Sequence, residues 1–281
     1  MLVTIGVMDS VKQRSEKRAS AKGAQEGKAR EVRAGAHLQP ALDLDAVNAT
    51  LAGQGPEAAI AWAHATFGEA LVASSSFGAH SAVMLHLLTL HAPSVRVILV
   101  DTGYLFEETY RFVELLRERL GFTLHVAQPK LTAAHQEALY GKLWEQGDAG
   151  VARYLEVNKS EPMTRALSEL GAQAWIAGIR RDQTAHRQGL RTVERQDGRY
   201  KVHPIIDWSL KDVEAYITRH RLPIHPLVDQ GYRSIGDWHS TLPTAPDQDP
   251  RDGRILGQKR ECGLHLDLDS RQNASLTSSG L

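Results

Sequence analysis

Short apolar runs alternate along the chain with longer segments whose apolar residues recur at helical spacing. The runs are rich in branched residues, have the length of strands and occupy residues 70–76, 95–100, 122–127, 174–179 and 201–206. Residues 107–120 predict a helix with one face formed by Tyr110, Val113, Leu116 and Leu120. Ser209 opens another helix, with Asp212 spaced as in a capping box. Strands alternating with helices predict an α/β fold: a doubly wound, mostly parallel sheet with helices on both faces.

The two ends of the chain depart from this pattern. Residues 10–36 carry eight Lys or Arg and three Glu without apolar periodicity. Residues 1–39 are therefore interpreted as a disordered basic extension; a docking arm and an organellar transit peptide are the alternatives, and the glutamates argue against transit. The α/β domain is expected over residues 40–250, and residues 251–281 are expected to form a C-terminal tail with a frayed, polar end.

Composition limits the classes of function. The chain is 42% hydrophobic and 23% charged, and no apolar stretch approaches the roughly 18 to 20 residues of a membrane helix. Its 33 basic and 33 acidic residues cancel, so attraction of the whole chain to nucleic acid or anionic lipid is not expected. Any anion site must be built locally. The opening MLVTIGVM lacks the features of a secretion signal, so we expect a cytoplasmic protein.

The chain contains one cysteine, Cys262, which can form no intrachain disulfide and cannot supply an iron-sulfur or multi-cysteine zinc site. A lone thiol is either inert or reactive. The cationic neighbours Arg254, Lys259 and Arg260 favour the reactive thiolate. A zinc site of Cys262 with His265 would need two further ligands that no nearby motif provides, so no metal is expected.

Three loops that follow predicted strands carry candidate chemistry, because ligands of open α/β sheets bind beyond the carboxyl ends of the strands. The first is Ser-rich and leads into a helix, and it predicts either an anion site or an ordinary helix cap: Ser74, Ser75, Ser76, Phe77, Gly78. The second, with Asp101, predicts contact with a ribose hydroxyl or an adenine amino group, or again a helix cap. The third gathers Arg180, Arg181 and Arg187, for which anion binding is favoured over a solvated loop.

These residues together resemble the phosphoadenylyl-sulfate (PAPS) reductase family, over about residues 40 to 266. The matching motifs are SSSFGAHSAV, VDTGYLFEETYRF, YGKLWEQG, NKSEPMTRAL, AGIRRDQTAHR, KVHPIIDW, PIHPLVDQGYRSIGD and GQKRECGLH. ECGLH preceded by Lys-Arg is the most specific of them, and DTGYLFEET follows. One departure is DWHSTLPTAPDQDP after Gly236, where relatives usually carry an additional basic residue.

The resemblance implies an adenine nucleotide alpha-hydrolase-like fold and assigns roles to individual residues. Contacts to the adenosine or its phosphosulfate are implied for Ser74, Ser75, Phe77 and Gly78, and contacts to the nucleoside for Asp101, Thr102 and Gly103. Contacts to phosphates are implied for Arg180, Arg181 and Arg187, and further anion contacts for Lys142, Arg254, Lys259 and Arg260. Cys262 is implied to be the nucleophile, on a mobile tail that folds over the substrate, and His265 to orient groups or transfer a proton.

The resemblance also implies the branch of the family. Relatives that reduce adenylyl sulfate hold an iron-sulfur cluster with a Cys-Cys and a Cys-x-x-Cys; here Tyr-Leu-Glu-Val stands before Asn158-Lys159 and no Cys-x-x-Cys exists. A cluster-free, PAPS-using homodimer of the cytoplasm is implied, with no bound cofactor. A Cys262 thiolate would attack the sulfur of PAPS, release adenosine 3′,5′-bisphosphate and form an S-sulfonate, which needs an external dithiol such as reduced thioredoxin or glutaredoxin.

Three other functions stay open at this point. Adenylyl sulfate could be the substrate even without a cluster. A PP-loop enzyme that splits ATP usually shows SGGxDS, whose two glycines and acid this chain lacks. A nucleotide-sensing protein would have no need of the reactive Cys262.

Overall fold

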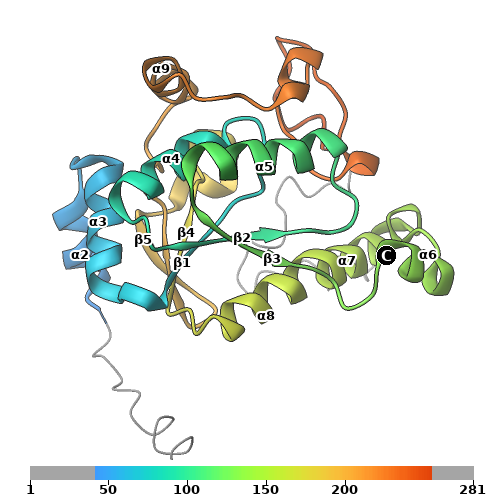
Figure 1. Ribbon diagram of the computed structural model, residues 1–281, viewed down its shortest axis with the longest axis horizontal. Helices are drawn as coiled ribbons and strands as arrows, with labels where there is room; N and C mark the ends of the chain where they lie inside the picture. Colours follow the sequence, from blue (N-terminus) through green and yellow to red (C-terminus); the bar gives the residue numbers. More distant parts are fainter. Residues whose placement is uncertain (1–41, 255–281) are drawn as a thin grey trace, which may run out of the picture. The chain divides into compact units, whose positions relative to one another are not determined.

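The computed structural model describes residues 42–254 (Figure 1). Every α-helix and β-strand given below lies between Leu44 and His220. The predicted extension at residues 1–39 lies outside the described residues, as does the predicted tail apart from residues 251–254.

A six-stranded sheet, in the order β3-β2-β1-β4-β6-β5, confirms the predicted architecture. The strands are β1 (Leu71–Ser74), β2 (Arg96–Val100), β3 (Thr123–Ala127), β4 (Ala174–Ala177), β5 (Val193–Gln196) and β6 (Arg199–Val202). Each neighbouring pair is parallel except β5 and β6. From β1 the chain continues through β2 and β3 toward one edge of the sheet, and then through β4, β6 and β5 toward the other edge. The change of direction at β1 creates the switch point where α/β proteins bind ligands.

The last predicted strand was placed wrongly. The run 201–206 is a strand only as far as Val202, and residues 203–206 form a turn. The actual strand, β6, begins at Arg199 and pairs with β5, which the apolar pattern missed because its sequence is Val-Glu-Arg-Gln. The connection Asp197-Gly198 has positive φ at both residues, as a tight hairpin turn requires. That Asp-Gly pair was the available signal for the hairpin.

Helices lie on both faces of the sheet, as predicted. They are α2 (Leu44–Leu51), α3 (Gly55–Phe67), α4 (Ser81–His91), α5 (Glu107–Leu120), α6 (Ala133–Tyr140), α7 (Gly147–Leu155), α8 (Glu161–Glu169) and α9 (Leu210–His220). In Figure 1, α4 and α5 lie above the strands and α8 lies below them. A π-helical turn, Glu156–Ser160, joins α7 to α8.

The core below the sheet is built from small and branched residues. Met163, Ala166 and Leu167 of α8 pack on Val72 of β1 and Ile98 of β2. Their removal from water supplies the main favourable free energy of this layer. The carboxyl ends of the central strands lead into the loops that carry the polar residues.

Two helices test the sequence patterns in detail. Helix α5 spans the predicted residues, but its buried face includes Thr109 and Phe112, whereas Tyr110 is 37% exposed. The capping box of α9 is confirmed: the backbone N–H of Asp212 donates to Ser209 Oγ, and the Ser209 backbone N–H donates to Asp212 Oδ2.

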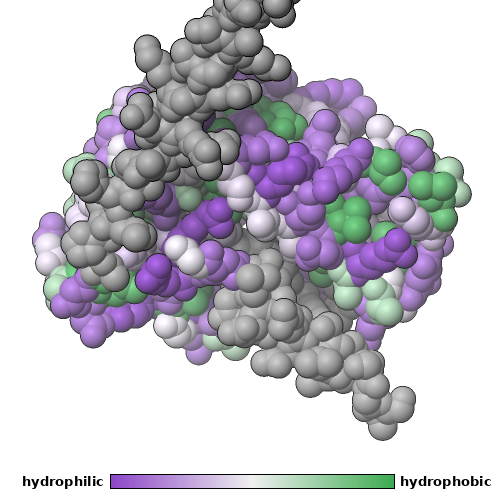
Figure 2. Space-filling view, turned by 90° about the horizontal axis from the view of Figure 1, so that it is seen from below, coloured by the Kyte–Doolittle hydropathy of each residue, from purple (hydrophilic) through white to green (hydrophobic). Residues whose placement is uncertain are grey.

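The surface agrees with the composition. On the face drawn in Figure 2, hydrophilic side chains cover most of the described surface and hydrophobic patches are smaller. None of the helices between residues 42 and 254 is both long and apolar enough to span a membrane.

Candidate active site

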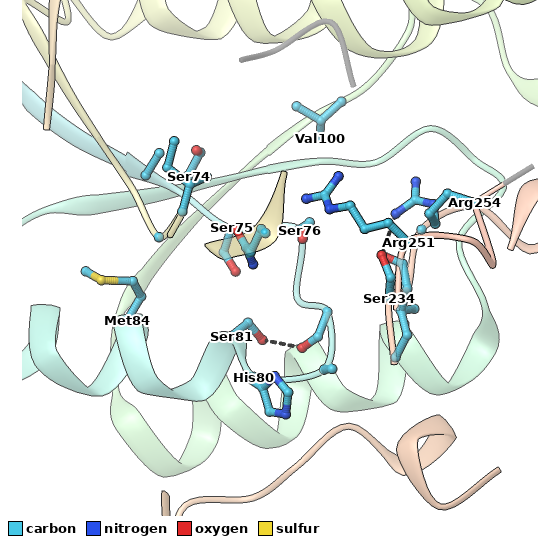
Figure 3. Close-up of a pocket in the computed structure, with 18 of the residues that line it drawn as sticks. Ser74, Ser75, Ser76, His80, Ser81, Met84, Val100, Ser234, Arg251 and Arg254 are labelled. Carbon is cyan, nitrogen blue, oxygen red and sulfur yellow. Dashed lines mark hydrogen bonds between the residues drawn. The ribbon is translucent and has the colours of Figure 1, made fainter. Parts of the chain in front are cut away.

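A cavity of about 290 Å³ lies at the carboxyl ends of β2, β1 and β4 (Figure 3). Its wall combines the loop after β1, the residues that follow β2 and β4, the π-helical turn and the segment 233–254. Parallel strands bring these loops to one edge of the sheet although they are far apart in the sequence. The cavity therefore lies where the sequence predicted chemistry.

The Ser-rich loop forms one wall. Ser74, Ser75 and Ser76 line the cavity, as do Gly78 and the residues that begin α4. The N-cap residue of α4 is His80, and no side chain caps this helix; the Ser81 hydroxyl donates instead to the Gly78 carbonyl, at 3.0 Å. Of the two interpretations of this loop, the helix cap is wrong. The helix N-terminus directs positive potential toward the cavity, as an anion site requires.

Phe77 supports this loop from behind. It is fully buried, packs against Phe122 with ring centroids 6.0 Å apart, and does not line the cavity. Its φ of +50° is a strained conformation for a residue with a side chain, and its N–H donates to Ser75 Oγ. Phe77 therefore fixes the conformation of the loop, and its contact with the adenosine or its phosphosulfate stays a prediction.

The residues after β2 divide between two roles. Thr102 lines the cavity, whereas Asp101 and Gly103 do not. The Asp101 carboxylate accepts hydrogen bonds within its own neighbourhood, from the Gly103 N–H at 2.9 Å, the Tyr110 hydroxyl at 2.6 Å and Gln128 Nε2 at 2.8 Å. Gly103 has φ +76°, and a Cβ there would lie 3.2 Å from Ala133 Cβ. Both residues shape the loop, and their contact with the nucleoside stays a prediction.

A buried ion pair, which the sequence analysis did not assign to the site, forms the wall beside Thr102. Lys159 Nζ lies 2.5 Å from Asp237 Oδ2, and Asp237 Oδ1 accepts a 2.6 Å hydrogen bond from the Thr102 hydroxyl. The Lys159 side chain is 10% exposed and Asp237 is fully buried. Burial favours a raised pKa for Asp237, but the charge and hydrogen bonds of Lys159 and Thr102 outweigh it and lower the pKa.

The position of Lys159 follows from local structure. It lies on the π-helical turn, which is widened relative to an α-helix and occurs often at functional sites. The motifs NKSEPMTRAL and PIHPLVDQGYRSIGD contain Lys159 and Asp237, so the signal was present, but a spacing of 78 residues between the two gives no hint that they meet.

Beside this pair, Tyr154, Trp144 and His239 form an aromatic cluster. Tyr154 is buried and lies edge-on to Trp144, and its hydroxyl lies 3.1 Å from His239 Nε2. His239 in turn stacks on Trp144 with ring centroids 3.9 Å apart. The three rings pack against one another next to the residues that precede Asn158 and Lys159.

The arginine loop after β4 contributes two of its three predicted residues. Arg180 and Arg187 are buried and line the cavity. Gln183 Oε1 accepts from the Arg180 backbone N–H and from the Arg187 guanidinium, and Arg180 Nε donates to Asp182 at 3.0 Å. These contacts hold both guanidiniums in fixed positions.

Arg181 faces Asp207 rather than the cavity, and its contact with a phosphate stays a prediction. It forms an ion pair with Asp207 and donates from Nε to the Leu190 carbonyl, and it does not line the cavity. Adjacent residues of an extended chain point in opposite directions, and sequence alone could not decide which of the two arginines faces the ligand.

Three further arginines come from the segment 233–254. Arg233, Arg251 and Arg254 line the cavity, and Figure 3 places Arg251 and Arg254 together beside Ser234. Arg254 donates to the Ile235 carbonyl and crosses so close to Gly236 that a Cβ there would lie 2.2 Å from its guanidinium. Arg251 follows Pro250, directly after the stretch DWHSTLPTAPDQDP that departs from the family pattern.

The other predicted site residues fall into two groups. Lys142 is about half exposed, pairs with Glu145 at 3.5 Å and does not line the cavity, and its anion contact stays a prediction. Cys262, His265, Lys259 and Arg260 lie outside the described residues. Between residues 42 and 254, no three His, Cys, Asp or Glu side chains gather where they would hold a metal ion.

Comparison with known proteins identifies the family. The model of the phosphoadenosine phosphosulfate reductase domain matches residues 70–243. The chain belongs to this family. It is 51% identical over 247 residues to a phosphoadenosine 5′-phosphosulfate reductase of Synechocystis sp., covering 87% of this chain and 99% of that protein, and 53% identical over 232 residues to one of Alkalilimnicola ehrlichii, covering 82% and 95%. The family resemblance is thus confirmed, and with it the assignment as an oxidoreductase acting on sulfur.

Solved structures agree with this family assignment. The PAPS reductase of Candida auris, solved as a phosphate complex, is 33% identical, with a TM-score of 0.64 over 73% of this chain and all of that one. An FMN adenylyltransferase of Candida glabrata is 15% identical, with a TM-score of 0.52 over 75% of this chain and 71% of its own, and it shows only that the nucleotide-binding fold is shared.

Proposed function

We propose that the protein reduces PAPS to sulfite and adenosine 3′,5′-bisphosphate in sulfate assimilation, with reduced thioredoxin or a related dithiol protein as electron donor. The observation that carries the proposal is the cavity itself: on a chain without net charge, six basic side chains from three separate segments converge on it. Their convergence provides for a ligand with several negative charges. That this ligand is PAPS is inferred from the relatives, which are phosphoadenosine 5′-phosphosulfate reductases.

The phosphosulfate end is assigned to the side of the cavity next to β2. There Lys159, fixed by Asp237, and Arg254 line the wall, and the chain leaves Arg254 toward Cys262 eight residues later. A buried, preorganised cation stabilises the charge that develops on a leaving phosphate without reorganising during the reaction. Lys159 and Arg254 therefore suit the departure of adenosine 3′,5′-bisphosphate.

The first half-reaction would be a transfer of the sulfo group. The Cys262 thiolate attacks the sulfur of PAPS and forms an S–S bond, while the sulfur–oxygen bond to the 5′-phosphate breaks and its electron pair leaves with the nucleotide. No net oxidation of the protein is needed at this stage. The product is an S-sulfonated Cys262, and His265 is proposed to orient groups or transfer a proton.

The second half-reaction would reduce this intermediate. A thiolate of the donor attacks Cys262 Sγ, sulfite leaves with the electron pair of the S–S bond, and a mixed disulfide forms. The second thiol of the donor then attacks its own half of that disulfide, which restores the Cys262 thiolate and leaves the donor oxidised. The donor thus supplies the two electrons. A homodimer in the cytoplasm, with no bound cofactor, completes the proposal.

The proposal is tested by sulfite release from PAPS and, in parallel, from adenylyl sulfate, each with reduced thioredoxin. We expect sulfite from PAPS at a much higher kcat/KM than from adenylyl sulfate, and none from Cys262→Ser, a variant that should still bind nucleotide. Equal kcat/KM values for the two substrates would contradict the preference for PAPS. A higher value for adenylyl sulfate would make adenylyl sulfate the substrate. ATP splitting without a thiol donor would contradict the proposal and favour the PP-loop alternative.

A further inference from the structure

The aromatic cluster contains a tyrosine hydroxyl that reaches the buried ion pair. Tyr154 is buried, and its hydroxyl lies 3.1 Å from His239 Nε2. The pKa of this hydroxyl is raised first by burial and then by the charge of Asp237; Thr102 lowers it, and a hydrogen-bonding contact with the Asp237 carboxylate raises it further. Tyr154 thus connects the ring of His239 to the carboxylate that holds Lys159.

The same two chain segments are joined twice. Tyr154 belongs to α7 and Lys159 to the π-helical turn that continues it, whereas Asp237 and His239 lie two residues apart after α9. Each segment therefore supplies one member of the ion pair and one member of the His239–Tyr154 contact. Stacking of His239 on Trp144, at 3.9 Å and 9° between the planes, fixes the ring that faces the hydroxyl.

The proton positions in this chain follow from which atoms are buried. Burial lowers the pKa of His239 to about 4, so the ring is neutral and carries one proton near neutral pH. His239 Nδ1 is buried and has no hydrogen-bond partner in the described part of the chain, and a buried N–H without a partner is costly. The proton is therefore assigned to Nε2, which donates to the Tyr154 oxygen and leaves the tyrosine proton for Asp237.

From this arrangement we infer that Tyr154 and His239 are positioning residues for the sulfur transfer: they hold Asp237, and through it the Lys159 ammonium, where the phosphate leaves. The inference rests on the proposed function, in which Lys159 stabilises that phosphate. Neither Tyr154 nor His239 lines the cavity, so neither is expected to touch the nucleotide. Their contribution is preorganisation, because a carboxylate fixed by several donors keeps its ammonium partner in one place during the reaction.

The test is a single-turnover measurement with the full, pre-reduced chain and PAPS, without a thiol donor. For Tyr154→Phe we expect the rate of bisphosphate release at saturating PAPS to fall about fivefold to thirtyfold. The PAPS concentration at half the maximal rate should change less than about threefold, because the lost hydroxyl does not touch the ligand. His239→Phe keeps a ring to stack on Trp144 but lacks Nε2, and it should show the same pattern with a smaller loss.

The matched control is Tyr104→Phe. Tyr104 is a buried tyrosine of the same ring cluster, 4.9 Å from Trp144 between centroids, but its hydroxyl donates to the Ala133 carbonyl. This variant should keep the rate of bisphosphate release within about twofold of wild type. An unchanged rate in Tyr154→Phe, a change in half-saturation alone, or an equal loss of rate in Tyr104→Phe would overturn the inference.

A second comparison separates positioning from general support of the fold. In the Asp237→Asn/Lys159→Met protein there is no ammonium to position, so adding Tyr154→Phe should slow release by less than about twofold. A loss as large as in the wild-type background would overturn the inference. Should Tyr154→Phe not fold, His239→Phe is compared in the same two backgrounds with the same criterion. Failure of the wild-type protein to release any nucleotide from PAPS would instead refute the proposed function.

Discussion

The buried pair of Lys159 and Asp237 gives the sharpest prediction about stability. Asp237→Asn keeps the shape of the side chain and an oxygen for the Thr102 hydroxyl, but it removes the negative charge 2.5 Å from Lys159 Nζ. Lys159, with a side chain 10% exposed, is then a buried ammonium that has lost its counter-ion. Removing one partner of such a pair typically costs about 3 to 5 kcal/mol of unfolding free energy.

The measurement is equilibrium unfolding of the full chain in urea, compared with thermal unfolding. A loss of about 3 to 5 kcal/mol should lower Tm by roughly 6 to 20 °C for a domain of this size. The matched control is Lys159→Met, which leaves Asp237 as the unpaired charge, together with the double variant Asp237→Asn/Lys159→Met. The double variant should be more stable than the sum of the single losses predicts, because it contains no unpaired charge.

The pair also predicts a pH dependence with a definite sign. Because the pKa of Asp237 is lowered in the folded protein below its ordinary value of 3.8, this carboxylate stabilises the fold above that value. Its contribution decreases as the pH falls below about 4 and is lost once the pH passes the folded pKa. Asp237→Asn should lack this part of the acid sensitivity. An Asp237→Asn protein within about 1 kcal/mol of wild type, or single losses that simply add, would refute the assignment of a buried, coupled pair.

Further predictions concern the cavity and the lone thiol. Gly236→Ala should displace the Arg254 guanidinium, since the new methyl group would lie 2.2 Å from it, and should weaken adenosine 3′,5′-bisphosphate about tenfold in a binding titration; unchanged affinity would contradict the close contact. Arg181→Gln should lose the partly exposed ion pair with Asp207 and the hydrogen bond to the Leu190 carbonyl, at a cost of about 1 to 2 kcal/mol in urea unfolding, and a clearly larger loss would contradict this estimate of the two contacts. With one cysteine in the chain, purified protein should be colourless and free of stoichiometric iron and acid-labile sulfide, and a visible charge-transfer band with bound iron would overturn this expectation.

The sequence pattern was sufficient where a feature depends on local periodicity or on a strand end. The first four strands of the sheet, the α5 boundaries and the Ser-rich and Arg loops were predicted, and both loops lie at the cavity. It was insufficient where a side chain's direction or a distant partner decides the role. Arg180 and Arg181 are adjacent and chemically identical, yet one lines the cavity and the other pairs with Asp207.

Two other differences have the same origin. Phe77 and Asp101 follow the expected strands, but packing and hydrogen bonds hold them outside the lining of the cavity. Lys159 and Asp237 become a pair only when the π-helical turn and the segment after α9 meet beside Thr102. The charged strand β5 lacks apolar alternation because it lies at the edge of the sheet, where its pairing with β6 rather than burial defines it.

The central claim, that sulfur is transferred to Cys262 before any electrons arrive, is tested most directly by one single-turnover measurement. Pre-reduced protein is mixed with PAPS without a thiol donor, and released nucleotide and intact protein mass are followed together. One thiol per chain cannot close a disulfide within that chain, so the reaction should stop after one equivalent of adenosine 3′,5′-bisphosphate per chain, with one SO₃ added to the Cys262 peptide. Reduced thioredoxin should then remove that mass and release sulfite. Nucleotide release that leaves Cys262 unmodified, or that yields only a disulfide between two Cys262 residues, would contradict the account.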